Sequence, residues 1–523
     1  MEVNEGKQSE SEEGSRLGDL YTHVNSANPA RPLLCPSPIA IGPGLVLRRA
    51  ELSDGPALSA FNARIHFPSA GRSTNEIFTA TSHAHPLLDP SCFTVIVNTD
   101  KNEIVSSVYS VPQVWFYSFA DVRVPFLVTR PEAVGTDPEY RAQGFVKKHF
   151  DVHHEWAESL GAPLQFIGGM PLYYTRFGYD ASPHRNAGVS GTYATISSIV
   201  AAKSPNFRFR LATVSDAEFL ENVTRSACAL RDEIWTDLNK EYWRNVIASR
   251  SAGNFTKYSL WILEHTDSLE TEEQVFSAVG FVKINAFGGA VKRFELASDT
   301  DISWTEATKA LLSWLPEFFL NHYPEYKAAI SAAYVNESES SAPNVAEPTI
   351  DTKVTELDAN WKFSLKFGKS HPAYTSVISS VLPIVEPPYY WYTRIGNQIQ
   401  FLNQILPVLN ARLKSSVLYA RYNGVVILAK NYNNGTNAAI LSVEKGVVVS
   451  VTTPSDVTIK TEQKNPEQVF VALGKTSLER MVLGFRTCSE LLELNEVMAS
   501  TYSAKFLDIL FPRMRNDYIS GLD

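Results

Sequence analysis

Cysteine is scarce in this chain: its 523 residues include only four, at positions 35, 92, 228 and 488. No two of them have the close spacing of a metal-binding or redox motif, so the cysteines predict neither a disulfide framework nor a zinc site, and the pattern is typical of a reduced cytosolic chain. No uninterrupted apolar run reaches the length of a membrane span. These absences predict a cytoplasmic protein without a membrane span.

Basic residues are outnumbered by acidic ones: the chain has 47 Lys and Arg residues and 56 Asp and Glu residues, and its formal net charge is -9. Nucleic-acid binding needs a basic face, so this balance argues against a nucleic-acid partner. The chain begins MEVNEGKQSESEEGS, which is acidic and polar, and neither a secretory signal nor a transit peptide is expected. We expect residues 1–42 to be disordered, because they carry little that could be buried.

The most informative stretch for predicting a ligand site runs from Val134 to Phe150 and has the sequence VGTDPEYRAQGFVKKHF. The pair Asp137-Pro138 is expected to end a strand, because a proline cannot continue a β-ladder. A helix is expected to open near Gly144. The first amides of a helix have no internal partners and lie at the positive end of its dipole, so they suit phosphate oxygens. This stretch therefore predicts a pyrophosphate site, to which Arg141 can add a charge-assisted contact.

The residues that follow extend the pattern. Apolar and aromatic side chains recur at helical spacing from Val146 to Leu160, and Gly161 is a helix stop signal. A short apolar strand is expected from Pro163 to Ile167, and the chain then continues through Gly168-Gly169 into MPLYYTRFGYD. The order is strand, phosphate turn, helix, strand and a tyrosine-rich turn.

Arg141 to Val146 resembles motif A of the GNAT superfamily of acyl-CoA-dependent N-acyltransferases, in which Arg or Gln is followed by two residues, Gly, one residue and Gly or Ala. Val146 stands in the last place. The segment from Tyr174 to Tyr179 resembles motif B, in which a tyrosine lies beside the thioester. The resemblance implies acetyl-CoA as co-substrate and Tyr174 as the acid for the departing thiolate, since a phenol with a pKa near 10 is a suitable donor. The residues expected to hold the cofactor are Val134, Gly135, Thr136, Arg141, Ala142, Gln143, Gly144, Phe145 and Val146.

The rest of the chain predicts two further units. Near residue 206 a strand (207–211) and a helix (216–229) restart the pattern, and a second GNAT-like unit is the economical interpretation. In the third unit we expect helix 401–413, strands over 417–422, 425–430, 438–443 and 447–453, and helices over 466–473, 477–483, 488–493 and 499–510. The fold class predicted is α/β (α+β), with two tandem GNAT-like mixed-sheet domains before a third α+β domain.

This order of units resembles the enhanced intracellular survival (Eis) type of acetyltransferase, which joins a GNAT domain, a degenerate GNAT domain and a sterol carrier protein-like domain. We therefore expect the ranges 1–42 disordered, 43–200 catalytic, 201–345 degenerate, 346–385 linker and 386–523 sterol carrier protein-like. The resemblance implies an amine acceptor, on a small molecule or a protein, that attacks directly in a ternary complex. No Arg/Gln-x-x-Gly turn lies between residues 284 and 304, so one CoA per chain is expected. The identity of the acceptor and the oligomeric state stay open.

Some residues have two interpretations at this point. Tyr174 could be a core tyrosine instead of an acid, and the aromatic run at 115–117 could line an acceptor cleft or fill a core. His149 and His153 share a helical face, but the helix lacks a metal motif and no metal is expected. Two other functions also remain open, a CoA-binding pseudoenzyme and a lipid-binding protein that acts through the third unit.

The chain ends FPRMRNDYISGLD, which is too polar for a core strand and could be a frayed terminus. In Eis-type enzymes the terminal carboxylate reaches into the site of the first domain, which implies Asp523 as the base. Deleting Ser520 to Asp523 should then lower kcat by about 10-fold or more. Thermal stability should change little because few apolar groups are removed. Steady-state kinetics and thermal denaturation check this, and a fully active deletion variant would exclude Asp523 as the base.

Overall fold

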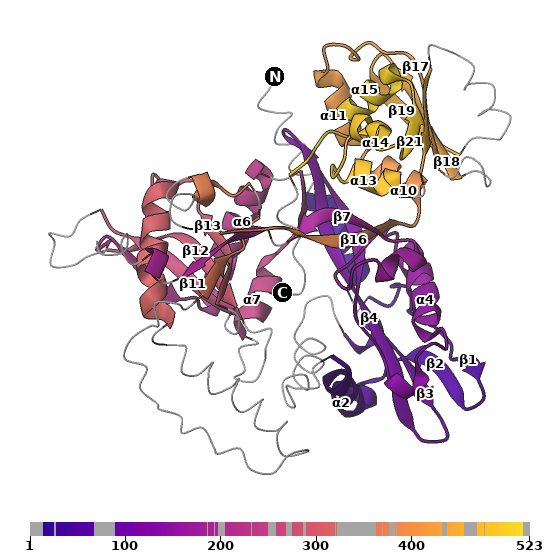
Figure 1. Cartoon of the computed structure of the whole chain (residues 1–523), viewed down its shortest axis with the longest axis horizontal. Coiled ribbons are helices and arrows are strands. Elements are labelled where there is room, and N and C mark those ends of the chain that lie inside the picture. Colours follow the sequence, from indigo (N-terminus) through magenta and orange to yellow (C-terminus); the bar gives the residue numbers. More distant parts are fainter. Residues whose placement is uncertain are drawn as a thin grey trace.

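The computed structural model arranges the chain around three β-sheets (Figure 1). It describes residues 14–25, 28–66, 89–185, 187–192, 194–196, 204–231, 233–248, 258–267, 275–285, 289–319, 321, 362–368, 370–375, 382, 384–430, 437–453, 468–474 and 476–515. None of the described helices is long and apolar enough to cross a membrane. The predicted mixed α/β fold class is confirmed.

The first sheet carries the strands on either side of the predicted phosphate turn. Its order is β1 (Ile39–Gly42), β2 (Leu45–Arg49), β3 (Phe93–Asn98), β4 (Glu103–Phe119), β5 (Val122–Thr136), β6 (Leu164–Ile167), β16 (Tyr389–Ile395) and β7 (Asp180–Arg185), while β10 (Ile234–Thr236) pairs with β4. Helices α2 (Gly55–His66) and α4 (Phe145–Ser159) pack against β4 and β5 from the two sides (Figure 1). The long β4–β5 hairpin is thus the centre of this unit.

Strands β5 and β6 pair over only a short length. Their parallel register joins Val128 to Leu164 and Thr129 to Gln165. Beyond this point β5 continues to Thr136 while it pairs with β4 on its other side, through a register shift opposite Ser107–Tyr109. Ala133 lies within the shifted part and has a left-handed φ of 46°, as an extra residue in a β-bulge often does. The two strands therefore diverge and leave backbone groups of β5 without a neighbouring strand on that side.

The second sheet draws strands from three stretches of the chain. Its order is β15 (Ile384–Glu386), β8 (Gly188–Thr192), β14 (Lys362–Leu365), β13 (Ala290–Leu296), β12 (Ser277–Asn285), β11 (Tyr258–His265) and β9 (Phe207–Leu211). The helices of this unit are α6 (Ala217–Arg231), α7 (Lys240–Ala248) and one over residues 304–319. Strand β8 lies before residue 200, within the range expected for the catalytic unit. Strands β14 and β15 begin within the range expected for the linker. The second sheet therefore contains strands from outside the range expected for the second unit.

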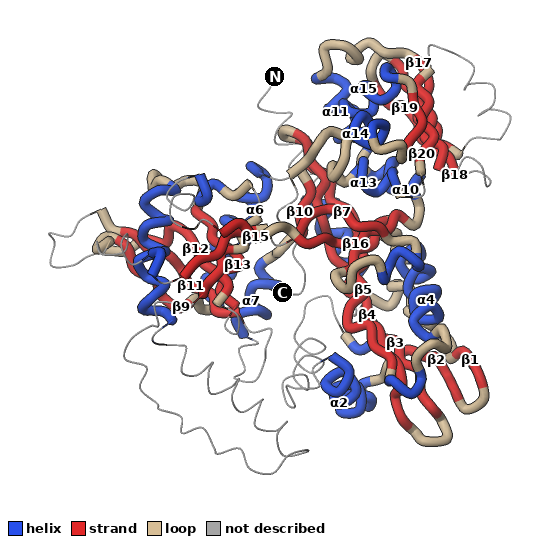
Figure 2. Tube along the Cα trace, in the orientation of Figure 1, coloured by secondary structure: helices blue, strands red, loops and turns tan. Residues whose placement is uncertain are grey.

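The third sheet has the order β19 (Val447–Thr452), β18 (Asn437–Glu444), β17 (Gly424–Lys430), β20 (Val469–Leu473) and β21 (Val497–Ala499). Its helices are α10 (Gln398–Gln404), α11 (Leu406–Ser415), α13 (Ser477–Val482), α14 (Cys488–Glu493) and α15 (Thr501–Leu510). Figure 2 shows α10 and α13 between this sheet and the first sheet, where α13 contacts β7 and β16. The third unit therefore packs on the first one through helices.

Two element predictions in this unit are wrong. Residues 466–473 were expected to be helical, but 469–473 form a strand parallel to β17, because Val469 and Val471 alternate with Phe470 between two cores. Residues 417–422 were expected to form a strand, but 417–421 form turns. Val417 and Leu418 are 99% and 77% exposed there, and no described strand pairs with them.

The aromatic run at 115–117 fills cores. Trp115 packs on Phe166 with ring centroids 4.3 Å apart, and Phe116 stacks on Trp235 at 5.0 Å. Tyr117 is buried at the contact between the first and third units, where its hydroxyl donates to the carbonyl of Val482 over 2.8 Å. The cleft-lining interpretation is therefore wrong for these three residues.

A buried cation completes this contact. Arg412, on α11, is 2% exposed. Its Nη1 donates to the Tyr117 hydroxyl over 3.1 Å and to the carbonyl of Leu510 over 2.7 Å. The guanidinium therefore ties β4 of the first sheet to the last described helix of the chain.

Replacing Tyr117 by Phe is expected to lower the free energy of unfolding by about 1–3 kcal/mol, because Val482 and Arg412 each lose a buried hydrogen-bond partner. The matched control is Tyr419→Phe. Tyr419 is also buried, and its hydroxyl makes no hydrogen bond to the described residues. Thermal denaturation compares the two variants, and equal melting temperatures would mean that the Tyr117 contacts do not stabilise the fold.

Candidate functional site

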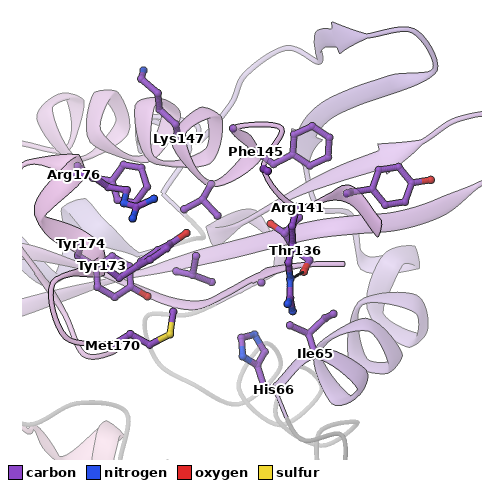
Figure 3. A pocket seen from close by; sticks show the side chains of 17 residues that line it. Ile65, His66, Thr136, Arg141, Phe145, Lys147, Met170, Tyr173, Tyr174 and Arg176 are labelled. Atoms are coloured by element: carbon purple, nitrogen blue, oxygen red, sulfur yellow. Dashed lines mark hydrogen bonds between the residues drawn. The ribbon is translucent and has the colours of Figure 1, made fainter. Parts of the chain in front are cut away.

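A cavity of about 860 Å³ lies where β5 ends, α4 begins and the turn η4 (Tyr173–Phe177) closes the far side (Figure 3). Eight of the nine residues expected to hold the cofactor line it, namely Val134, Gly135, Thr136, Arg141, Ala142, Gly144, Phe145 and Val146. Gln143 is exposed and is not among the lining residues. Tyr174 lines the same cavity, so the structure brings both predicted motifs to one place.

The turn before α4 presents a run of backbone amides. Ala142 and Gly144 have left-handed φ values of 63° and 77°, and α4 begins at Phe145. Among the residues that the structure describes, none accepts a hydrogen bond from the backbone N–H groups of residues 142–147. A Cβ at Gly144 would meet nothing within 4 Å, so the space beside these amides is open. Such a cluster of unpaired donors at a helix start suits an anion.

Cationic side chains surround this turn. Arg141 and Lys147 line the cavity and are exposed, and the Nε of Arg141 donates to the carbonyl of Thr136 over 3.3 Å. Arg176 lines the cavity from η4, where its guanidinium lies 4.8 Å from the ring centre of Tyr173. Three positive charges therefore lie around the open amides, which favours an anion with several negative charges.

Tyr174 lies in a tight aromatic environment. It is 6% exposed, and Tyr173 packs against it edge-on with ring centroids 5.1 Å apart. A Cβ at Gly169 would come within 2.5 Å of the Tyr174 ring, so the close approach of the backbone requires glycine there. Burial, with the Glu132 carboxylate adding to it, raises the pKa of Tyr174 well above its usual value. The phenol is therefore protonated at neutral pH, as a proton donor has to be.

The hydroxyl of Tyr174 makes no hydrogen bond to any described group. A donor in a cavity without an internal partner is available to a ligand. Tyr173 also lines the cavity. The sequence did not identify Ile65, His66 or Met170, which reach the cavity from α2 and from the loop before η4. No spacing in the sequence relates them to the two motifs.

The two histidines on α4 belong to a buried hydrogen-bond network. Thr94 Oγ1 lies 2.7 Å from His149 Nδ1 and 2.8 Å from His153 Nε2. His149 Nε2 lies 3.2 Å from Ser106 Oγ, and the Ser106 hydroxyl donates to the carbonyl of Gly135 over 2.7 Å. Burial lowers the pKa of both imidazoles, to about 3 for His153, so they are neutral at physiological pH. The network holds α4 against the strands that end at the cavity.

Two carboxylates close to the cavity have an arginine as counter-ion. Asp137 lies 2.6 Å from the guanidinium of Arg64, and Glu132 lies 2.5 Å from that of Arg130. Among the described residues no group of three or more His, Cys, Asp or Glu side chains could hold a metal ion. Asp523 lies outside the described residues.

No protein-family model matches the chain, and no curated protein sequence matches it. Several solved structures share its fold. They include a GCN5-related N-acetyltransferase from Anabaena variabilis ATCC 29413, with a TM-score of 0.55, 12% identity and coverage of 89% of this chain and 97% of that one. They also include a GCN5-related N-acetyltransferase from Kribbella flavida, with a TM-score of 0.54, 14% identity and coverage of 91% and 100%.

A third similar structure is a conserved protein of unknown function from Enterococcus faecalis V583, described as a probable N-acyltransferase, with a TM-score of 0.56, 12% identity and coverage of 91% and 100%. The fold of this chain is that of the GCN5-related N-acetyltransferases, as the two motifs predicted. At such identities the likeness concerns the fold, so the chemistry has to come from the side chains of the site.

Replacing Gly144 by Glu is expected to abolish acetyl-CoA binding, because the carboxylate would occupy the open space beside the amides and repel the phosphates. Gly144→Ala is the matched control. Both variants carry the strain of a side chain at a left-handed φ, about 1–2 kcal/mol, but only Glu adds a negative charge. Isothermal titration calorimetry measures both affinities, and unchanged affinity in Gly144→Glu would mean that the turn does not hold the phosphates.

Proposed function

We propose that this chain is an acyl-CoA-dependent N-acyltransferase that moves an acetyl group to a primary amine by direct attack in a ternary complex. One observation carries the proposal: residues 142 and 144–147, whose amides have no partner among the described residues, line the same cavity as the buried phenol of Tyr174. The first group suits a pyrophosphate, and the second suits the leaving group of a thioester.

The pyrophosphate of CoA would accept hydrogen bonds from the amides at the start of α4, with Arg141 and Lys147 supplying positive charge. Pantetheine is itself strand-like in its amide spacing, and it would lie between β5 and β6 beyond their last pair, Thr129 and Gln165. There the backbone of β5 lacks a neighbouring strand. This path leads from the phosphate turn toward Tyr174.

The thioester carbonyl would accept a hydrogen bond from the backbone near Gly135 or Thr136, which stabilises the oxyanion of the tetrahedral intermediate. The amine nitrogen forms a bond to the carbonyl carbon, and the carbon–sulfur bond then breaks. The thiolate that leaves takes the proton of the Tyr174 hydroxyl. A free alkylamine is mostly protonated at neutral pH, so the reaction also needs a group that takes a proton from the nitrogen.

We also propose that residues 43–200 form the catalytic unit, 201–345 a degenerate GNAT-like unit and 386–523 a sterol carrier protein-like unit joined by the linker 346–385. Asp523, which lies outside the described residues, stays a second candidate for the group that takes the proton of the amine nitrogen, as the resemblance implies. A CoA-binding pseudoenzyme and a lipid-binding protein are the alternatives, but the helices of the third unit pack into one core with the first sheet. That packing favours a supporting role for the third unit.

Release of free thiol from acetyl-CoA in the presence of a panel of amines tests the proposal. Amine-dependent thiol release is expected, with a mass increase of one acetyl group on the acceptor. Tight CoA binding without thiol release for any amine would support the pseudoenzyme. Absence of CoA binding would overturn the proposal.

Replacing Tyr174 by Phe is expected to lower turnover by about 10²-fold or more with little change in acetyl-CoA affinity, because the proton is needed only as the thiolate departs. Tyr173→Phe is the matched control, since its ring lines the same cavity next in sequence. Steady-state kinetics and calorimetry give the two quantities. Equal effects in the two variants would mean that Tyr174 is not the acid.

A further inference from the structure

The cavity contains one described side chain that is not used in the mechanism above and that can take up a proton near neutral pH. The titratable side chains that line it are His66, Tyr140, Arg141, Lys147, Tyr173, Tyr174 and Arg176. Imidazole is the only group of these types whose unperturbed pKa lies near neutrality. His66 is therefore a candidate for the group that accepts the proton of the amine.

His66 is the last residue of α2, and its ring lies against the end of β5 (Figure 3). A Cβ built on Gly135 would lie 3.1 Å from His66 Nε2, with Ile65 at 3.1 Å and Phe61 at 3.3 Å. The absence of a side chain at Gly135 therefore allows the imidazole to approach the backbone of β5. The same backbone, near Gly135 and Thr136, is where the thioester would be held.

Two influences act on the imidazole itself. Burial lowers the pKa of His66, and a hydrogen bond to the backbone of Ala133 acts in the opposite direction. A histidine with a lowered pKa is neutral at pH 7 and can therefore accept a proton. A backbone partner on one ring nitrogen also favours one tautomer of the neutral ring.

The other bases near the cavity are less suitable. The carboxylate of Asp137 is paired with Arg64, and that of Glu132 is paired with Arg130. Both carboxylates are therefore already engaged by a cation. His149 and His153 are fully enclosed between α4 and the sheet and bonded to Thr94, so neither can reach a substrate.

We propose that His66 is the general base of the acyl transfer and takes the proton that the amine nitrogen loses as its bond to the thioester carbon forms. The inference rests on the proposed function. The nitrogen–carbon bond forms, the nitrogen–hydrogen bond breaks and the imidazole becomes imidazolium. The carbon–sulfur bond then breaks, and the thiolate receives the proton of Tyr174. Afterwards the imidazolium returns its proton to solvent and the phenolate takes one back, so the sum is amide plus free thiol.

Charged groups on the neighbouring elements affect the protonation of the His66 imidazole. Arg64 and its partner Asp137 lie beside the end of α2, Arg141 and Lys147 line the cavity from the turn and α4, and Arg176 lines it from η4. Lys147 is paired with Asp151 over 2.7 Å, and the guanidinium groups of Arg141 and Arg176 oppose a further positive charge in the cavity. Activity should therefore fall with decreasing pH through the lowered pKa of His66, as the neutral base is lost.

The first experiment locates the side chain next to the acyl group without any acceptor. S-bromoacetyl-CoA alkylates a nucleophile beside its carbonyl: the nitrogen–carbon bond forms and bromide leaves. Peptide mass spectrometry should find the adduct on His66, and an excess of desulfo-CoA should suppress it. Two outcomes would overturn the role of His66 alone. One is an adduct on another residue that desulfo-CoA suppresses. The other is the absence of any adduct in a chain that binds CoA by calorimetry. Absence of CoA binding would overturn the proposed function itself.

The second experiment measures catalysis. His66→Gln keeps an amide donor for the backbone of Ala133 but removes the base, and should lower kcat by about 10²-fold with unchanged acetyl-CoA affinity. Its pH profile should lose the acidic limb that the wild type shows. His23→Gln is the matched control, because His23 contacts the carbonyl of Leu160 and does not line the cavity. A His66→Gln variant with the wild-type rate and acidic limb would overturn the inference.

Discussion

The rest of the site depends on the short pairing of β5 with β6. Two residue pairs hold these parallel strands together, and the strands then separate while β5 stays bonded to β4. Backbone amides and carbonyls that would normally be satisfied by a neighbouring strand are thereby left to face a cavity. The amides at the start of α4, which have no partner among the described residues, add donors to the same cavity. A ligand with an amide-containing arm and a diphosphate matches both sets of groups.

Several buried hydrogen bonds stabilise the cavity between the ends of β5 and α4. Ser106, His149 and Thr94 form a chain of hydrogen bonds from the carbonyl of Gly135 to the interior face of α4. Since both histidines of the network are neutral, it costs no buried charge. It holds α4 in place relative to the end of β5. The histidines on α4 thus serve the site through structure and not through a metal.

The third unit is part of the same rigid frame. Strand β16 pairs with β6 on one side and with β7 on the other, so a segment after residue 386 completes the first sheet. Tyr392 of β16 accepts a hydrogen bond from the amide of Leu172, just before the turn that carries Tyr174. Arg480 of α13 is ion-paired with Asp180 of β7. The position of the phenol therefore depends on residues more than two hundred positions away in sequence.

The sequence by itself determined the local features of this protein. The turn before α4, the helix stop at Gly161 and the tyrosine turn depend on proline, glycine and side-chain periodicity within a few residues, and the fold prediction followed from their order. Only the tertiary structure decided which strands share a sheet, because a strand such as β16 or β20 pairs wherever an open edge and a matching core are found, and this does not depend on sequence distance. The same reason applies to the cavity: His66 and Ile65 lie about seventy residues before Gly135, and only the packing of α2 on β5 brings them to it.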